Sequence, residues 1–287
     1  MILYNDVFLK HDCPHIENKN RVLAIKKALI DLGIKYYSPQ IEEDPIKYIE
    51  KAHDKQYIEM IKSLIDMAKE MGCIYIDGDT YLSKDSWDPI LYAVYYSVYA
   101  VNNDFLFAVV RPPGHHAGKY GKANAISQGF CIFNNAAIAA LNYKGRVAIV
   151  DIDLHHGNGT EDIVKHNKNI RYYSIYAKDI YPLPDNKSYD NIYKYPLPID
   201  ATNEDWISSF DLLLANLIEW DPDKVIVSLG FDAHKDDPLS VFRTDYTIYK
   251  YAFQKLAQFN PTYILEGGYN YDVLYNGTKL LIKFSRS

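Results

Sequence analysis

The segment from Val147 to Thr160 contains the residues of this sequence that are best suited to metal chemistry. It reads Val-Ala-Ile-Val-Asp-Ile-Asp-Leu-His-His-Gly-Asn-Gly-Thr, so a short apolar run ends in acids and histidines. The apolar run is typical of a strand buried on both faces, and alternation along it places Asp151, Asp153 and His155 on one side. Unpaired charge at such a place is unfavourable, whereas carboxylate oxygen and imidazole nitrogen together suit a zinc-like cation. The alternative is a polar cluster that caps the strand without a metal.

Chemically useful residues also follow three other predicted strands. They are Gly114-His115-His116, Asp232 and Glu266-Gly-Gly-Tyr269. Because ligands of open parallel sheets bind beyond the carboxyl ends of the strands, we expect these groups to converge on one active site. Asp153, His155 and Asp232 would then be three ligands of one metal, with a fourth position left for water or substrate. Taken alone, Asp232 is explained equally well as a helix N-cap.

His115 and His116 are adjacent in a loop that begins Arg111-Pro-Pro-Gly, and prolines restrict such a loop. A lone histidine in a loop is usually a solvated bystander. A pair of histidines beside a metal is better explained as residues that act as general acid and general base. Asp151 and Asn158 are candidate partners that would set the tautomers of the two rings.

Tyr269 follows two glycines, which allow the backbone to approach closely, so that its hydroxyl can point into the site. The alternative is a glycine turn followed by a packed tyrosine, which would be the better explanation if this motif stood alone.

Strands and helices alternate throughout the second half of the chain, which predicts a parallel sheet covered by helices on both faces. No repeat or linker interrupts the pattern, so residues 1–287 are predicted to form a single domain. The strands are predicted at residues 1–4, 105–110, 146–153, 170–176, 224–229 and 262–265. The helices are predicted from Asn18 or Asn20 to Gly33 and at residues 54–71, 86–101, 135–141, 157–166, 205–220, 244–259 and 272–284. The stretch from Tyr181 to Pro198 is interpreted as a long surface excursion.

Composition excludes some classes of function. With 287 residues and 48% apolar residues the chain can bury a sizeable core, and its net charge of −6 argues against a nucleic-acid partner. Its three cysteines, Cys13, Cys73 and Cys131, are too few and too scattered to predict a disulfide framework. The sequence has no recognisable signal peptide and no apolar stretch of the roughly 18 residues that span a membrane. We therefore expect a cytoplasmic protein with no membrane partner.

These motifs resemble those of the zinc-dependent histone deacetylase family, including the bacterial and archaeal histone-deacetylase-like amidohydrolases and acetylpolyamine amidohydrolases. The resemblance spans nearly the whole chain in order, and its two-glycine motif before the tyrosine is like that of the class II branch. The matching segments are Arg111-Pro-Pro-Gly-His-His-Ala117, Gly129-Phe-Cys131, Asp151-Ile-Asp-Leu-His-His-Gly-Asn-Gly159, Gly230-Phe-Asp232, Asp237-Pro238 and Leu265-Glu-Gly-Gly-Tyr-Asn270, with weaker similarity at His15, Glu17, Arg21, His53 and Tyr57.

The resemblance implies the arginase–deacetylase α/β fold, with a mostly parallel eight-stranded sheet and helices on both faces. It implies Zn²⁺ bound by Asp153, His155 and Asp232. It also implies a structural K⁺ near the zinc, for which Asp151 and Ser174 would supply ligands.

The resemblance also assigns roles in catalysis and substrate binding. His116 would be the general base and later the acid, His115 its electrostatic partner, and the Tyr269 hydroxyl the donor to the substrate carbonyl. The backbone carbonyl of Gly129 would accept from the substrate amide N–H, and Phe130 would form one wall of the acyl-lysine tunnel.

Some positions match the family less closely. Tyr181 would form the other wall of the tunnel, although that alignment is loose. Leu239 stands where eukaryotic members selective for polyamines carry Glu, which weakens a dedicated polyamine function. Asn158 replaces the Asp of class I members.

The implied activity is a zinc-dependent amidohydrolase that removes acetyl or other acyl groups from protein lysines and releases acetate and a free amine. The same chemistry on small acetylated amines is the main alternative. Two others are a catalytically silent acyl-lysine binder and a ureohydrolase of the same fold with two manganese ions.

Overall fold

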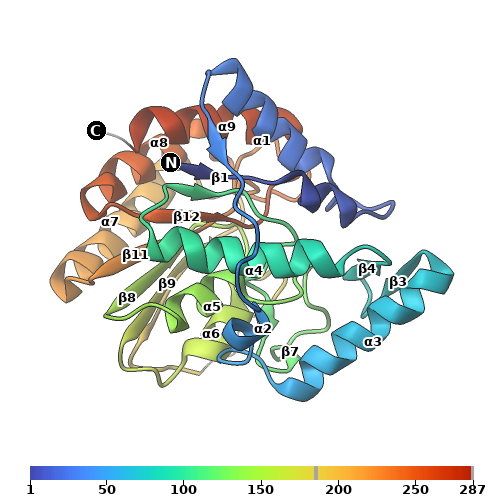
Figure 1. Ribbon diagram of the computed structural model, residues 1–287. Helices are drawn as coiled ribbons and strands as arrows, with labels where there is room; N and C mark the ends of the chain where they lie inside the picture. Colours follow the sequence, from blue (N-terminus) through green and yellow to red (C-terminus); the bar gives the residue numbers. More distant parts are fainter. Residues whose placement is uncertain (184–186, 286–287) are drawn as a thin grey trace.

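A central sheet with helices on both faces makes up the core of the molecule (Figure 1). The computed structural model describes residues 1–183 and 187–285. Within these residues the sheet has eight strands, and all neighbouring strands are parallel. From one edge to the other, the strands are β10 (Ile192–Leu197), β9 (Ile170–Ala177), β8 (Val147–Asp151), β11 (Lys224–Leu229), β12 (Thr262–Leu265), β5 (Phe107–Ala108), β1 (Ile2–Leu3) and β2 (Tyr36–Tyr37). The predicted α/β fold is therefore confirmed.

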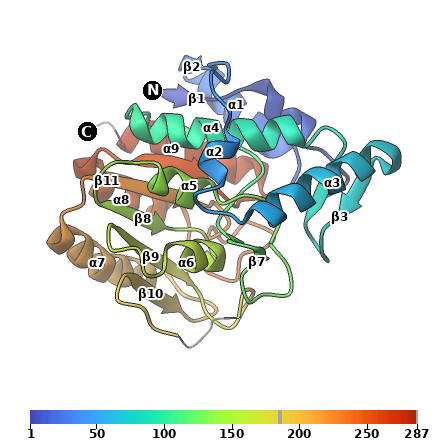
Figure 2. The same ribbon diagram turned by 60° about the horizontal axis from the view of Figure 1, so that its bottom comes forward.

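The helices form two layers, which Figures 1 and 2 show from two directions. One layer contains α2 (Ile46–Ile49), α4 (Trp87–Asn102), α5 (Asn135–Leu141) and α6 (Asn158–Val164). The other contains α1 (Asn20–Asp31), α7 (Asn203–Trp220), α8 (Tyr246–Leu256) and α9 (Tyr271–Phe284). Short 3₁₀ helices lie at Asp6–Lys10 and Ala257–Phe259.

The central strands are apolar runs because both of their faces are covered. Every residue of β8 and β11 is buried. Asp151, the last residue of β8, lies beside Ser174 on β9 and Ser228 on β11. The first acid of the chemical motif is thus held inside the sheet, and the residues after it emerge at the carboxyl edge.

Two sequence predictions were wrong in part. The stretch from Tyr181 to Pro198 is not entirely a surface excursion, because β10 lies within it and pairs with β9; residues 184–186 lie outside the described part of the chain. Helix α1 begins at Asn20 with Lys19 in the N-cap position, so neither predicted asparagine is the cap. The Asn18 side chain instead accepts from the N–H of Asn20.

A hairpin that the sequence did not predict lies beside the sheet. Its strands, β3 (Cys73–Tyr75) and β4 (Tyr81–Ser83), are antiparallel and pack against α3 (Lys55–Met71). A disulfide joins Cys13 to Cys73, whereas Cys131 is a buried free thiol. The expectation of no disulfide framework therefore missed one bridge. A second short hairpin pairs β6 (Ala117–Gly118) with β7 (Gly121–Lys122).

Among the described residues, no helix is both long and apolar enough to cross a lipid bilayer.

Candidate active site

Asp153, His155 and Asp232, the predicted metal ligands, meet at the carboxyl edge of the central sheet. Asp153 and His155 follow β8, and Asp232 follows the neighbouring strand β11. One ligand atom from each residue lies within 4.8 Å of the other two. The Nδ1 atom of His155 is 3.2 Å from Asp153 Oδ1 and 3.0 Å from Asp232 Oδ2. Both carboxylates are buried, whereas the His155 side chain is 15% exposed, so the cluster opens to solvent on the histidine side.

This cluster holds more negative than positive charge. Burial and the neighbouring Asp153 carboxylate raise the pKa of Asp232 to about 7. Burial lowers the pKa of His155, but its hydrogen bonds to Asp153 and Asp232 outweigh burial and raise the pKa to about 9. A single imidazole cannot neutralise two buried carboxylates, and unpaired buried charge is unfavourable. A divalent cation would supply the missing charge, and two oxygens with one nitrogen fit zinc.

The backbone around the cluster fixes its carboxylates. The N–H of Gly267 donates to Asp153 Oδ2 over 2.9 Å, and the N–H of Leu154 donates to Asp232 Oδ1 over 3.0 Å. A Cβ atom on Gly267 would lie 2.5 Å from the first carboxylate and 2.6 Å from the second, so only glycine fits there. These bonds orient the ligands before any cation binds.

His115 and His116 lie beside the predicted metal ligands with their rings in contact. The two ring centroids are 4.0 Å apart, and the His116 ring is 5.9 Å from that of His155. Nδ1 of His115 is 3.0 Å from an oxygen of Asp151, and Nδ1 of His116 is 2.8 Å from the side-chain oxygen of Asn158. An acceptor at Nδ1 assigns the proton of the neutral ring to that nitrogen and leaves Nε2 for proton transfer.

The two adjacent histidines have opposite shifts in pKa. Burial lowers the pKa of His115, but the carboxylates of Asp153 and Asp151 outweigh burial and raise it to about 10. Burial and the positive charges of His115 and His155 hold the pKa of His116 well below its ordinary value. His116 is therefore neutral near pH 7 and able to accept a proton, as a general base must be.

Tyr269 lies on the loop that follows β12. Its ring is edge-on to Phe130, with centroids 5.6 Å apart, and its N–H donates to Asp237 over 2.6 Å. Asp237 also accepts from the N–H of Asn270, so it anchors this loop. Burial raises the pKa of Tyr269 well above its ordinary value. The hydroxyl therefore keeps its proton and can donate to a substrate oxygen.

The predicted tunnel residues lie at the approach to the cluster. The Tyr181 ring is 4.9 Å from that of His116 and 6.4 Å from that of His155. Gly129, which precedes Phe130, has φ +49°. A Cβ atom there would lie 2.5 Å from the His116 ring and 3.0 Å from Tyr181. Glycine thus permits the close approach of this loop to His116.

Three other predicted residues have contacts that leave their roles as predictions. The carboxylate of Asp151 already accepts from a backbone N–H and from the hydroxyl of Tyr172, and the hydroxyl of Ser174 is 3.0 Å from a nitrogen of His156. A potassium ion at Asp151 and Ser174 would share these oxygens. Leu239 is half-buried, and its N–H donates to Asp237 over 3.1 Å.

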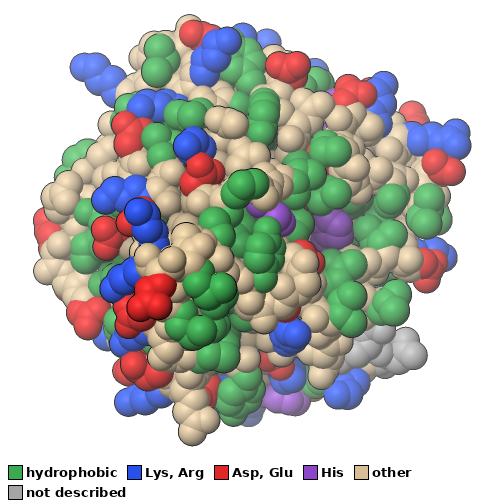
Figure 3. All heavy atoms as spheres, turned by 90° about the vertical axis from the view of Figure 1, so that its right-hand side faces the viewer, with side chains coloured by type: hydrophobic (Ala, Val, Ile, Leu, Met, Phe, Trp, Pro, Cys, Tyr) green, Lys and Arg blue, Asp and Glu red, His purple; other side chains and the backbone are tan. Residues whose placement is uncertain are grey.

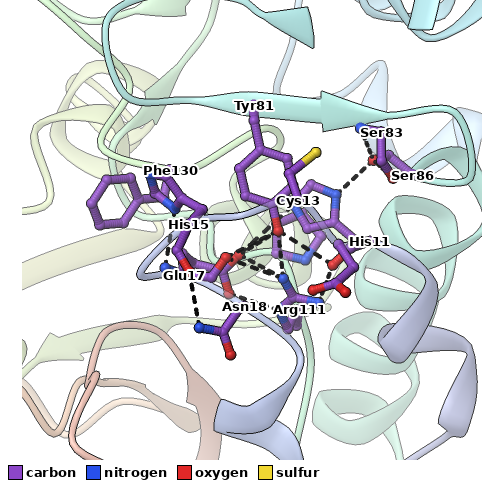
Figure 4. A network of polar contacts seen from close by, with 12 residues as sticks. His11, Cys13, His15, Glu17, Asn18, Tyr81, Ser83, Ser86, Arg111 and Phe130 are labelled. Carbon is purple, nitrogen blue, oxygen red and sulfur yellow. Dashed lines mark hydrogen bonds and ion pairs between the residues drawn. The ribbon is translucent and has the colours of Figure 1, made fainter. Parts of the chain in front are cut away.

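A buried network next to the loops of His115 and Tyr269 was not predicted (Figure 4). The Glu17 carboxylate accepts from Arg111 over 2.7 Å and from Arg21 over 2.8 Å. Arg21 also donates to the carbonyls of Glu266 and Gly268, in the loop that carries Tyr269. Arg111 begins the loop of the histidine pair. All three charged residues were visible in the sequence motifs. Glu17 and Arg21 are four residues apart, whereas Glu17 and Arg111 are 94 residues apart, and this separation hid the network.

Glu266 is a further residue whose role the sequence did not reveal. One of its oxygens accepts from the N–H groups of Gly114 and His115, so it supports the histidine loop. Burial raises its pKa to about 7, and its other oxygen has no hydrogen-bond partner among the described residues. Atoms of Glu266, His115 and Cys131 lie within 4.8 Å of one another and form a second set of possible ligand atoms.

Comparisons with known proteins identify the family to which this chain is similar. Residues 15–284 match the family model described as "Histone deacetylase domain". The chain is 35% identical over 293 residues to an uncharacterized protein of Methanocaldococcus jannaschii, covering 96% of this chain and 84% of that protein. It is 31% identical over 221 residues to acetylpolyamine amidohydrolase 1 of Pseudomonas aeruginosa, covering 70% and 62% respectively.

The crystal structure of the HDA15 HD domain shares the fold, with a TM-score of 0.87 and 28% sequence identity. The similarity covers 99% of this chain and 90% of that one. The fold is therefore of the arginase–deacetylase type, as the sequence motifs implied. From its motifs, its fold and the match over nearly its whole length, this chain belongs to the histone deacetylase family.

Proposed function

We propose that this protein is a zinc-dependent amidohydrolase that removes acetyl or other acyl groups from lysine side chains of proteins. One observation carries the proposal: a cluster of two carboxylates and one imidazole, short of positive charge, lies beside a histidine whose ring is held neutral. Membership of a family of deacetylases supports the same reaction class.

The residues divide the chemistry among them. Zn²⁺ held by Asp153, His155 and Asp232 would polarise the amide carbonyl and acidify water. His116 removes a proton from the attacking water through Nε2 and later gives it to the departing amine. Tyr269 donates a hydrogen bond to the oxygen on which negative charge develops. The bond to Asn158 keeps the His116 ring in the tautomer that this exchange requires.

The surface around the site suits a lysine presented by a polypeptide. In Figure 3, which looks onto the side where the β3–β4 hairpin lies in Figure 1, histidines reach the surface among hydrophobic side chains. Exposed hydrophobic residues occur on the segments that carry the tunnel residues, at Ile126 and Leu183, and beside His15, which contacts Phe130, at Ile16 and Tyr75. Apolar surface of this kind favours the flanking residues of a peptide over a free polycation.

Deacetylation of small acetylated amines is the second candidate, and it is favoured by the similarity to the acetylpolyamine amidohydrolase. Half-buried Leu239 offers no carboxylate to a second amine, which supports the protein-lysine substrate instead. A two-manganese ureohydrolase is less well supported, because the second ligand set includes the thiol of Cys131, and Mn²⁺ prefers oxygen ligands.

A substrate panel tests the proposal. Acetate release is measured for the zinc-loaded protein with an acetyl-lysine peptide and with an acetylpolyamine, beside a chelated control. We expect the peptide to have the higher kcat/KM and the chelated protein to be inactive. Preference for the acetylpolyamine would establish the second candidate. Binding of the peptide without acetate release would identify a catalytically silent binder.

A further inference from the structure

The backbone of Phe130, the predicted tunnel wall, has an unusual conformation. Its φ is +69°, in the left-handed region that residues with side chains seldom adopt. Such a conformation is strained and persists only where neighbouring groups hold it. The N–H of Phe130 donates to the hydroxyl of Thr80 over 3.2 Å, and its ring is edge-on to His15 with centroids 4.8 Å apart. Thr80 and His15 therefore hold this residue from two sides.

These two neighbours come from segments that are far apart in the sequence. His15 belongs to the segment of residues 11–19, and Thr80 immediately precedes β4 of the hairpin. The disulfide between Cys13 and Cys73 joins the two segments covalently. Figure 4 shows Cys13 beside Tyr81, with His15 between Tyr81 and Phe130. The bridge thus closes a clamp whose two arms both contact the tunnel wall.

The turn of the hairpin also holds the chain that leads into Phe130. A carboxylate oxygen of Asp79 accepts from the hydroxyl of Ser127 over 2.7 Å. An oxygen of Asp77 accepts from the N–H of Gln128 over 2.8 Å. Displacement of the hairpin would therefore move residues 127–130 together, and the clamp affects the whole loop that ends in the tunnel wall.

We propose that the Cys13–Cys73 disulfide positions Phe130 at the mouth of the active site, so that reducing it weakens substrate binding. The part that concerns substrate rests on the proposed function, whereas the positioning of Phe130 does not. Reduction breaks one S–S bond and forms two S–H bonds, and the bridge takes up two electrons and two protons. A dithiol reductant supplies them and is itself oxidised to a disulfide.

Access to the two sulfurs differs. Cys13 is buried, with 6% of its surface exposed, whereas Cys73 is half-buried at the start of β3. A dithiol would therefore attack the sulfur of Cys73 and release the thiolate of Cys13. Cys131 is fully buried and is not part of the bridge, so it does not replace either partner.

The experiment compares the oxidised and reduced forms of the zinc-loaded protein, below the melting temperature of the reduced form. Alkylation and mass measurement count the free thiols. Steady-state kinetics with an acetyl-lysine peptide give kcat and KM, and hydrogen–deuterium exchange reports on residues 127–133. The double variant Cys13→Ser/Cys73→Ser is the matched control, because reductant cannot change it further.

On reduction we expect KM to rise about tenfold, as for loss of one well-packed contact in a pocket, with kcat little changed. Exchange at residues 127–133 should become faster, and the double variant should behave like the reduced protein with or without reductant. Reduced protein with an unchanged KM and unchanged exchange would overturn the proposal, as would three free thiols in the air-oxidised protein. If reduction speeds exchange at residues 127–133 but the protein has no deacetylase activity, the clamp is supported and the proposed function is refuted.

Discussion

Two clusters of buried charge lie close together in this molecule, and they are built in opposite ways. In the first, Asp153 and Asp232 share one imidazole nitrogen of His155. In the second, a single carboxylate, that of Glu17, accepts from two guanidinium groups. The first cluster has excess negative charge, and the second has excess positive charge that backbone carbonyls help to satisfy.

The pKa shifts of the two clusters express this difference. In the second cluster, burial would raise the pKa of Glu17, but Arg111 and Arg21 outweigh burial and hold it well below its ordinary value. In the first, the pKa of Asp232 is raised to about 7. A cluster that stabilises the charged form of its own carboxylate is suited to a structural role. A cluster that destabilises the charged form of one of its own carboxylates is suited to binding a cation. This contrast distinguishes the candidate site from the network that supports it.

Asp232→Asn is expected to have the largest effect on activity. It removes one of the three proposed ligands, so bound zinc and its several kcal/mol of transition-state stabilisation should be lost, and turnover should fall about a thousandfold. The metal-free variant should melt no lower than metal-free wild type, because the repulsion from Asp153 is relieved. Metal analysis, acetate release and thermal melts test this, with Asp200→Asn at an exposed ion pair as control. Full zinc content in the variant would contradict the assignment.

Glu17→Gln is expected to affect stability rather than zinc binding. It leaves two buried guanidinium groups without a counter-charge, which should lower the free energy of unfolding by about 3–5 kcal/mol. Denaturant unfolding measures this change, and metal analysis of the folded fraction should still find zinc. A stability within experimental error of wild type would show that the network is not the scaffold described above.

Tyr269→Phe is expected to lower catalysis without affecting metal binding at the first cluster. Loss of one hydrogen-bond donor to the developing oxyanion should lower kcat about a hundredfold, and zinc content should be unchanged. Steady-state kinetics beside metal analysis test both expectations. Near-normal turnover would refute the role of the hydroxyl.

The smallest expected effect is a pH dependence of the metal-free protein. Asp232, with a pKa of about 7, and His155, with a pKa of about 9, both bind protons more tightly in the folded state than in the unfolded chain. Their contribution to stability is therefore present at low pH and lost as the pH rises, between 3.8 and about 7 for Asp232 and between 6.5 and about 9 for His155. Thermal melts of chelated protein should show Tm lower by on the order of 5 °C at pH 9.5 than at pH 6.5. Zinc-loaded protein should not show this decrease.

The sequence predicted the inner sheet better than its surroundings. The bounds of β11 and β12 were predicted correctly, because an apolar run between polar ends is a local signal. The edge strand β10 was missed, because it contains Pro196 and is only partly buried, and its pairing with β9 is a tertiary contact.

In the candidate site, too, some residues were predicted from the sequence and others were missed. Its ligands and histidines stand in compact motifs, and their convergence followed from the parallel sheet. The contacts of Glu17 with Arg111 and of Glu266 with Gly114 join residues more than 90 positions apart, and no spacing in one sequence reveals such pairs. The Cys13–Cys73 bridge was missed for the same reason, since only the folded chain brings the two residues within bonding distance.

Zinc titration of the metal-free protein, after the chelator has been removed, tests the central claim most directly. Bound metal and acetate release from an acetyl-lysine peptide are measured together. The charge deficit at Asp153, His155 and Asp232 predicts no activity without metal and a linear rise that ends at one zinc per chain. Acetate release by the fully chelated protein, or a rise that continues to two metal ions per chain, would contradict it.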